Sequence, residues 1–292
     1  MAPLSGFEHI VREREPLAPH TWLRLGGVAE YFAEPTSVDE LSRLVRRCAE
    51  LNWPVRLLGG GSNLLIRDEG VAGVVVRLAA GPFCAIEVRD NMVTCGGGAR
   101  LGHVISASVG GGLGGLEQLA GIPGTVGGAL HGNAGTEAGD IGQFTESATV
   151  MLRSGEILTR AREDLRFAYR ASSLDELVIL SARFQLERDN PEVLTKRLQK
   201  RWIIAKSSQP TSDLTAGCIF KNPIGATAAN LIEQAGLKGA RSGQVEVSGT
   251  HPNFFVAGAG ATSRDVLKLI DQVKTQVATR LGVELETQIE VW

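Results

Sequence analysis

The sequence lacks the features that mark membrane proteins and polyanion-binding proteins. No apolar run approaches the roughly 20 residues that a membrane-spanning helix needs. Neither sign of charge dominates, because 30 Lys and Arg residues stand against 32 Asp and Glu residues. Hydrophobic residues make up 43% of the 292-residue chain, as in an ordinary globular protein. The composition therefore gives no reason to expect nucleic acid or a membrane as a partner.

Cysteine is scarce and forms no CxxC pair anywhere in the chain. The N-terminal segment is charged where a signal peptide would need an apolar stretch. These observations predict a cytoplasmic protein with reduced thiols, and we expect no metal site. The four cysteines are Cys48, Cys84, Cys95 and Cys218.

Alternating helical and strand-like patterns run along the chain and predict an α+β fold. Apolar residues recur at helical spacing in Ser37–Leu51, Leu101–Val109, Glu192–Ala205 and Thr262–Leu281. Strand-like runs occur at Pro54–Leu58, Gly73–Leu78, Leu177–Leu186, Asn253–Ala257 and Leu285–Trp292, with hairpins around Arg89–Asn91 and Ser154–Gly155. A polar break that ends in Pro191 predicts a domain boundary near Asn190.

The first of two glycine-dense segments is GGGSNLL at Gly59–Leu65, directly after a predicted strand. Consecutive small residues expose backbone N–H groups, and Ser62 and Asn63 add short donors, which suits a pyrophosphate. A tight turn between two buried strands is the alternative interpretation. The segment is not a P-loop, because no Gly-Lys-Ser/Thr follows.

The second segment, Gly96–Gly135, has 15 glycines in 40 residues, interleaved with apolar residues, which favours a folded structure over a linker. Gly110–Gly115 formally satisfies GxGxxG. The preceding Leu101–Val109 predicts a helix where a dinucleotide fingerprint requires a strand, so this match carries no weight. Farther along, His131 and Asn133 are either ligand contacts or partners of the loop backbone.

An arginine beside aromatic residues is the first feature suited to catalysis. Arg170 lies within Phe167–Ser172 and directly follows Tyr169. An arginine held rigidly by an aromatic ring can stabilise a developing oxyanion. The alternative is a surface arginine that only stacks on Tyr169.

Ala216–Pro223 combines a thiol, a lysine and an asparagine within five residues. A short strand here would place Cys218 and Phe220 on one face and Lys221 on the other. The thiol can serve as an acid, but an inert buried cysteine and a solvated lysine are the alternatives.

The C-terminal strand carries a row of polar residues. Glu286, Gln288 and Glu290 alternate with Thr287 and Ile289, so a regular strand would place all three on one face. Acid–base chemistry would require one carboxylate to turn into a cleft, whereas the alternative is the solvent face of an edge strand.

Taken in order, these segments resemble the UDP-N-acetylenolpyruvoylglucosamine reductases, flavoenzymes of bacterial peptidoglycan synthesis. The motifs are short, but they span nearly the whole chain in the family's order. The matching strings are HTWLRLGG (His20–Gly27), LLGGGSNLL (Leu57–Leu65), LAGIPGTVGGALHGNAG (Leu119–Gly135), FAYRAS (Phe167–Ser172), AGCIFKNP (Ala216–Pro223), LIEQAGLKG (Leu231–Gly239) and HPNFFV (His251–Val256).

The resemblance implies a two-part FAD-binding domain of the vanillyl-alcohol-oxidase (PCMH) type at 21–190. It places an N-terminal segment at 1–20 and a smaller α+β substrate-binding domain at 191–292. Non-covalent FAD and NADPH would reduce UDP-N-acetylglucosamine enolpyruvate to UDP-N-acetylmuramate. An FAD-dependent sugar or alcohol oxidase of the same fold and a non-catalytic flavin-binding protein are the alternatives. The implied FAD contacts are Gly59, Gly60, Gly61, Ser62, Asn63, Gly124, Thr125 and Gly128.

The resemblance also implies catalytic roles for three residues. Arg170 matches the family's arginine and would stabilise the negative charge that hydride addition leaves on the substrate. Cys218 stands where many members have a proton-donating serine, and a thiol, with a reference pKa of about 8.5, should donate at least as readily. The family's C-terminal glutamate aligns with Gln288 without a gap, or with Glu290 on the Glu-Val pair; we choose Glu290, because a two-residue slip preserves the strand face.

The spacing of the motifs resembles the shorter, type II form of the family. Only 48 residues separate Arg170 from Cys218, whereas members with a tyrosine-bearing substrate loop carry a longer insertion there. Other groups would then have to bind the UDP-sugar. We predict Lys221 as a point charge for phosphate and Asn222 as a hydrogen-bonding partner.

Overall fold

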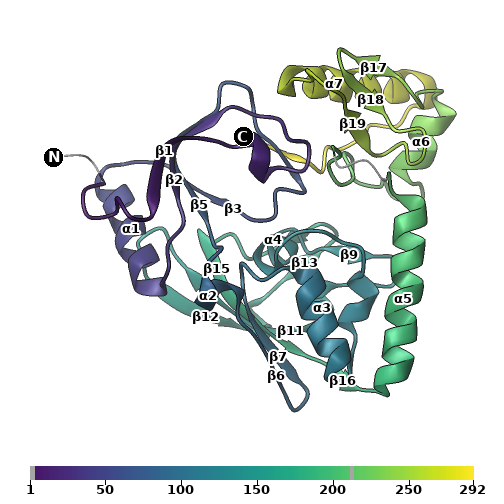
Figure 1. Cartoon of the computed structure of the whole chain (residues 1–292). Coiled ribbons are helices and arrows are strands. Elements are labelled where there is room, and N and C mark those ends of the chain that lie inside the picture. Colours follow the sequence, from purple (N-terminus) through teal and green to yellow (C-terminus); the bar gives the residue numbers. More distant parts are fainter. Residues whose placement is uncertain (1–3, 211–213) are drawn as a thin grey trace. The chain divides into compact units, whose positions relative to one another are not determined.

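The computed structural model describes residues 4–210 and 214–292, which form two compact units (Figure 1). Residues 1–3 of the predicted N-terminal segment and 211–213 of the predicted C-terminal domain lie outside the described residues. Unit 1 consists of Met1–Glu15, Glu30–Gly60 and Ala72–Ala205, and unit 2 of Pro16–Ala29, Gly61–Val71 and Lys206–Trp292. The domain boundary near Asn190 stays a prediction, since compact units and domains are different divisions of a chain.

Unit 1 begins with a four-stranded sheet and one amphipathic helix. The sheet order is β1 (Val11–Pro16), β2 (Val28–Ala33), β5 (Val71–Arg77) and β3 (Val55–Leu58). Ser37 caps the N-terminus of α1 (Val38–Glu50) by accepting a hydrogen bond from the Glu40 amide at 3.2 Å. The helix buries Leu41, Leu44, Val45 and Cys48 against Val74 and Val76 of β5. Helix α1 and strands β3 and β5 agree with the helix and the two strands that the sequence predicts for this region.

The second sheet of unit 1 has five antiparallel strands. Its order is β12 (Ile157–Ala161), β11 (Thr145–Met151), β15 (Val178–Gln185), β7 (Met92–Gly96) and β6 (Ile86–Arg89). The two predicted hairpins are its β6–β7 and β11–β12 pairs. Helices α3 (Leu101–Gly110) and α4 (Val126–His131) contact its central strands (Figure 1). Gly110 ends a helix, which confirms that Gly110–Gly115 is not a Rossmann fingerprint.

One long helix and several short elements complete unit 1. The long helix is α5 (Pro191–Ser208), which the sequence predicts at Glu192–Ala205; its residues up to Ala205 belong to unit 1 and the rest to unit 2. The remaining helices are α2 (Gly81–Cys84), η2 (Leu116–Leu119), η3 (Ile141–Phe144) and η4 (Arg162–Asp164). The remaining strands are β8 (Leu113–Gly114) paired with β16 (Glu187–Arg188), β9 (Gly135–Thr136) paired with β10 (Gly139–Asp140), and β13 (Phe167–Ala168) paired with β14 (Ala171–Ser172).

Unit 2 contains a three-stranded antiparallel sheet that contacts α7, and α6 contacts α7. The strands are β17 (Arg241–Ser242), β18 (Val245–Val247) and β19 (Phe255–Ala257); the helices are α6 (Ala228–Gln234) and α7 (Ser263–Leu281). Thr262 and Asp265 form a capping box at the start of α7. The unit also contains η1 (Ala18–His20) and the parallel pair of β4 (Leu64–Leu65) and β20 (Glu290–Val291).

Two strands predicted in unit 2 are shorter than expected. The predicted strand Leu285–Trp292 is reduced to β20, and the segment around Cys218 makes only isolated bridges, at Thr215 and Phe220. Both segments exchange single hydrogen bonds with several partners, so neither builds a continuous ladder. None of the helices among residues 4–210 and 214–292 is long and apolar enough to cross a bilayer.

Candidate functional site

The two glycine-dense segments come together in unit 1. A Cβ on Gly60 would lie 2.6 Å from Gly124 Cα, and one on Gly59 would lie 2.9 Å from Thr125 Oγ1. Both distances are shorter than a van der Waals contact, so side chains are excluded from this crossing. The site is therefore walled by backbone from two segments more than 60 residues apart in sequence, as the interpretation of a cofactor cradle requires.

The beginning of the second glycine-dense segment holds Gly124 in place. The Leu101 amide donates to Gly124 O at 3.1 Å, and the Gly127 amide donates to Gly97 O at 2.7 Å. Thr125 caps α4, where its hydroxyl accepts from the Gly128 amide at 3.4 Å. These bonds fix the backbone of the predicted FAD contacts at 124–128, and a rigid wall rich in glycine fits an extended cofactor.

The rest of the first loop, Gly61–Asn63, belongs to unit 2. Gly61 has φ +66°, and a Cβ there would collide with His20 O, so only glycine fits. Asn63 Nδ2 donates to Gln288 O at 3.1 Å, and the carbonyl of Asn63 accepts from the Glu290 amide at 3.0 Å. Asn63 therefore has a structural partner in addition to its predicted role at the pyrophosphate.

Arg170 occupies the turn of the β13–β14 hairpin in unit 1. Its backbone has φ +57°, which is uncommon for a residue with a side chain. Its Nη1 donates to Gly135 O at 2.8 Å, and the guanidinium carbon lies 5.4 Å from the Tyr169 ring centroid. The Nε atom is buried and has no hydrogen-bond partner. The arginine thus stacks on Tyr169 and still has a buried donor available to an anion.

The segment that carries Cys218 is held by one buried asparagine in unit 2. Asn253, which is 2% exposed, accepts from the Phe220 amide at 2.9 Å and donates from Nδ2 to Phe220 O at 2.8 Å. Its own carbonyl accepts from the Ile219 amide at 2.9 Å. These three bonds replace the strand ladder that the sequence predicted. In the sequence, Asn253 is a polar residue beside the apolar run Phe254–Val256, a pattern that could have indicated this buried role.

The predicted substrate residues also have partners within unit 2. Lys221 Nζ forms an ion pair with Glu286, and the Lys221 amide donates to Glu286 O at 2.9 Å. Asn222 Oδ1 accepts from the Ala228 amide at 2.9 Å, at the start of α6. A phosphate that binds Lys221 would therefore have to compete with Glu286.

The C-terminal segment changes its pairing partner near Ile289. The amides of Gln288 and Ile289 both donate to Ile219 O, at 2.7 and 3.4 Å, whereas the Glu290 amide donates to Asn63 O. Leu285 and Ile289 are buried, whereas Glu286 and Glu290 are exposed, so burial still alternates along the segment as a strand pattern predicts. The choice of Glu290 rests on the resemblance and stays a prediction.

His131 and Asn133 both bond the backbone of unit 1. His131 Nδ1 lies 3.0 Å from Leu174 O. Asn133 is 2% exposed, donates to Ala168 O at 2.8 Å and accepts from the Gly142 amide at 3.1 Å. Of the two interpretations that the sequence left open, these contacts favour a partner of the loop backbone.

The cysteines, all within the described residues, form no disulfide. Burial raises the pKa of Cys48 to about 11 and that of Cys95 to about 12. Thiols with such pKa values stay protonated and unreactive at neutral pH. Cys84 and Cys218 are only partly buried.

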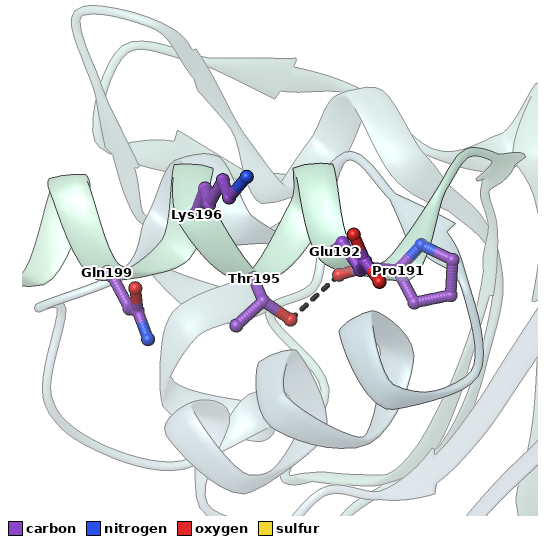
Figure 2. Close-up of a pocket in the computed structure, with 5 residues that line it drawn as sticks. All are labelled: Pro191, Glu192, Thr195, Lys196 and Gln199. Carbon is purple, nitrogen blue, oxygen red and sulfur yellow. Dashed lines mark hydrogen bonds between the residues drawn. The ribbon is translucent and has the colours of Figure 1, made fainter.

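A hollow of about 380 Å³ lies along the first turns of α5, and none of its lining residues is a predicted site residue (Figure 2). Its lining residues are Pro191, Glu192, Thr195, Lys196 and Gln199. The Thr195 hydroxyl donates to Pro191 O at 2.7 Å, within the helix itself (Figure 2). Because its lining comes from one helix and includes no converging set of polar groups, the hollow is not a catalytic site.

Two family models cover most of the chain. Residues 29–160 match the FAD binding domain, and residues 209–292 match the C-terminal domain of UDP-N-acetylenolpyruvoylglucosamine reductase. Among solved structures, UDP-N-acetylenolpyruvylglucosamine reductase from Thermus caldophilus is similar with a TM-score of 0.84 and 36% identity, covering 97% of this chain and 99% of that one. The 6-hydroxy-D-nicotine oxidase from Arthrobacter nicotinovorans has a TM-score of 0.61 at 14% identity, a likeness of fold alone.

Curated relatives are similar in sequence to this chain along nearly its full length. The UDP-N-acetylenolpyruvoylglucosamine reductase of Rhodopirellula baltica is 37% identical over 97% of this chain and 93% of its own length. The second such reductase of Symbiobacterium thermophilum is 41% identical over 97% of this chain and 92% of its own. The predicted fold, an FAD-binding part followed by a smaller α+β part, is confirmed by these matches. The chain belongs to the UDP-N-acetylenolpyruvoylglucosamine reductase family.

Proposed function

We propose that this chain reduces UDP-N-acetylglucosamine enolpyruvate to UDP-N-acetylmuramate with NADPH and non-covalent FAD, as an enzyme of peptidoglycan synthesis. The family assignment supports the reaction. The observation that carries the catalytic proposal is Arg170, a cation that one carbonyl and one ring hold in place while its buried Nε has no partner.

The close approach of Gly59 and Gly60 to Gly124 and Thr125 would form the cofactor site. When bound, FAD supplies the redox chemistry, because it can accept hydride from NADPH and deliver hydride to a carbon acceptor. Backbone amides without side chains suit its pyrophosphate and its flat ring system. The proposed contacts are Gly59, Gly60, Gly61, Ser62, Asn63, Gly124, Thr125 and Gly128.

Substitution of Gly60 by alanine tests the cradle. Gly60 does not have a positive φ, so the new Cβ acts only through its 2.6 Å approach to Gly124 Cα. We expect Gly60→Ala to lose most of its FAD, because the two backbones must separate. Flavin absorbance per mole of purified protein measures the loss.

Gly102→Ala is the matched control for this substitution. Gly102 lies in α3, and a Cβ there would meet no atom within 4 Å. Alanine is the better helix former by about 0.5–1 kcal/mol, so this variant should retain its FAD. Equal FAD content in the two variants would contradict the proposed cradle.

Arg170, Cys218 and Glu290 would carry the proton and charge chemistry on the substrate. Hydride addition at the terminal carbon of the enolpyruvyl group leaves negative charge spread onto the substrate carboxylate, where the Arg170 guanidinium would stabilise it. The Cys218 thiol would then donate its proton to the ether-bearing carbon and become a thiolate. Glu290 would supply a carboxyl group to the same proton transfer, and Lys221 and Asn222 would bind the UDP-sugar.

The position of the family's glutamate can be decided by matched amide substitutions. We expect Glu290→Gln to slow substrate reduction by about 100-fold or more, because a carboxyl group leaves the proton transfer. Glu286→Gln should mainly change KM, because it frees Lys221 from its ion pair. Rapid kinetics of the substrate-reduction step measures both. An active Glu290→Gln beside an inactive Gln288→Ala would assign the role to Gln288, and an inactive Glu286→Gln would assign it to Glu286.

NADPH consumption under anaerobic conditions tests the reaction itself. We expect the purified protein to be yellow and to oxidise NADPH continuously only while UDP-N-acetylglucosamine enolpyruvate is present. Sustained NADPH consumption that ignores the enolpyruvyl sugar but depends on oxygen would favour the oxidase alternative. A yellow protein that consumes no NADPH with either acceptor would favour the non-catalytic flavin-binding protein.

A cytoplasmic location is part of the proposal. The proposed acid is a partly buried thiol, which oxidation to a sulfenic acid would inactivate. A reducing compartment keeps such a thiol functional.

A further inference from the structure

We propose that Asn133 is a positioning residue for Arg170: its buried side chain fixes the hairpin that carries the guanidinium. This inference rests on the proposed function of Arg170. All the residues concerned lie in unit 1.

The β13–β14 hairpin is too short to be stable alone. Each strand contributes two paired residues, Phe167 opposite Ser172 and Ala168 opposite Ala171. Even complete two-stranded hairpins are marginally stable in water. The turn also holds Arg170 at φ +57°, a strained conformation for a residue with a side chain. Contacts from outside the hairpin must therefore maintain it.

The segment His131–Gly135 provides those contacts. Asn133 Nδ2 donates to Ala168 O at 2.8 Å, directly before the turn. Ser172 Oγ donates to His131 O at 2.9 Å, directly after it, and Arg170 Nη1 donates to Gly135 O at 2.8 Å. Three hydrogen bonds thus join one loop to the first strand, the second strand and the charged tip of the hairpin.

Asn133 is the buried member of this set. It is 2% exposed, and its Oδ1 accepts from the Gly142 amide at 3.1 Å, so the side chain bridges two backbone segments. The hydrogen bond from Asn133 to Ala168 O is partly shielded from water, so solvent does not fully replace it when the donor is removed. Since a misplacement of about 1 Å can cost a catalytic group 100-fold in rate, a loose hairpin would impair Arg170 without removing it.

Asn133 has φ +41°, a backbone conformation that Asp and Gly can also adopt. Substitutions by these two residues therefore test the inference. Asn133→Asp keeps the acceptor for Gly142 but replaces the donor to Ala168 O by an oxygen, and Asn133→Gly removes both. We expect each to slow the substrate-reduction step by about 10- to 100-fold, with unchanged NADPH oxidation in the first step and unchanged FAD content. Ser172→Ala, which removes a more exposed bond between the same segments, should change that rate by less than about 3-fold.

A double-mutant cycle separates positioning from a general structural effect. If Asn133 acts through Arg170, Asn133→Asp should cost almost nothing further in the Arg170→Ala background. Equal slowing in both backgrounds would overturn the inference. Both variants at wild-type rates would overturn it as well.

Hydrogen exchange gives a readout that is independent of activity. We expect faster exchange at 167–172 in Asn133→Asp, because a local opening requires less free energy than global unfolding. If exchange is faster but Arg170→Ala is fully active, the proposed function of Arg170 fails while the support of the hairpin by Asn133 stands. Unchanged exchange at 167–172 would overturn the inference itself.

Discussion

Replacement of Arg170 by alanine is expected to slow substrate reduction by about 100- to 1,000-fold, the cost of removing one preorganised group that stabilises an oxyanion. The structure supplies the reason for preorganisation: Gly135 O and the Tyr169 ring fix the guanidinium, while Nε is buried and has no partner. NADPH oxidation in the first half of the cycle should be unchanged, because the charge develops only on the enolpyruvyl substrate. Stopped-flow measurement of the two halves separates them.

Arg162→Ala is the matched control for Arg170→Ala. The Arg162 guanidinium lies 5.5 Å from the Phe167 ring centroid, nearly the same contact that Arg170 makes with Tyr169. Arg162 is exposed, so its cation–π contact contributes little. We expect its variant to retain the wild-type rate. Equal rates for Arg170→Ala and the wild type would remove Arg170 from the mechanism, and equal losses in the two variants would indicate a shared effect on the fold.

The substitutions of Cys218 are expected to have the second large effect. Cys218→Ala should slow the substrate-reduction step by about 100- to 10,000-fold, because general acid catalysis contributes that much. Cys218→Ser should keep most activity, since its hydroxyl can donate a proton from the same segment, which Asn253 holds by three hydrogen bonds. Single-turnover oxidation of the NADPH-reduced enzyme by the enolpyruvyl sugar measures both rates.

Cys84→Ala controls for loss of a thiol, because Cys84 is the other partly buried cysteine and donates only to Leu78 O, at 3.7 Å. Its activity should be unchanged. Peroxide offers a further comparison: it should inactivate the wild type and leave Cys218→Ser active. Near-normal turnover in both Cys218→Ala and Cys218→Ser would exclude this thiol as the acid.

Local sequence patterns predicted an element correctly where its hydrogen bonds form within that element or with its neighbour in sequence. The helical spacing of Leu41, Leu44, Val45 and Cys48 is enough to identify α1, because all of them pack on one face. The β6–β7 hairpin follows from two short apolar runs around a polar turn. In these cases the hydrogen-bond partners lie within the element or in its sequence neighbour.

The C-terminal segment shows where such patterns failed. Alternation of Glu286, Gln288 and Glu290 predicted one continuous strand, yet the segment pairs first with Ile219 and then with Asn63. This change of partner limits the regular strand to β20. Since the two partners lie more than 150 residues apart in the sequence, no local pattern could have shown it.

The sequence by itself determined the family, the FAD-binding part and the residue types available for catalysis, because these depend on motifs and their order. Only the tertiary structure decided what the asparagines do. Asn133 bonds a residue 35 positions away, Asn253 one 33 positions away and Asn63 one 225 positions away. A short amide side chain can form hydrogen bonds with a ligand or with the backbone, and the sequence does not distinguish the two. The actual partner depends on which distant segment the fold places beside it.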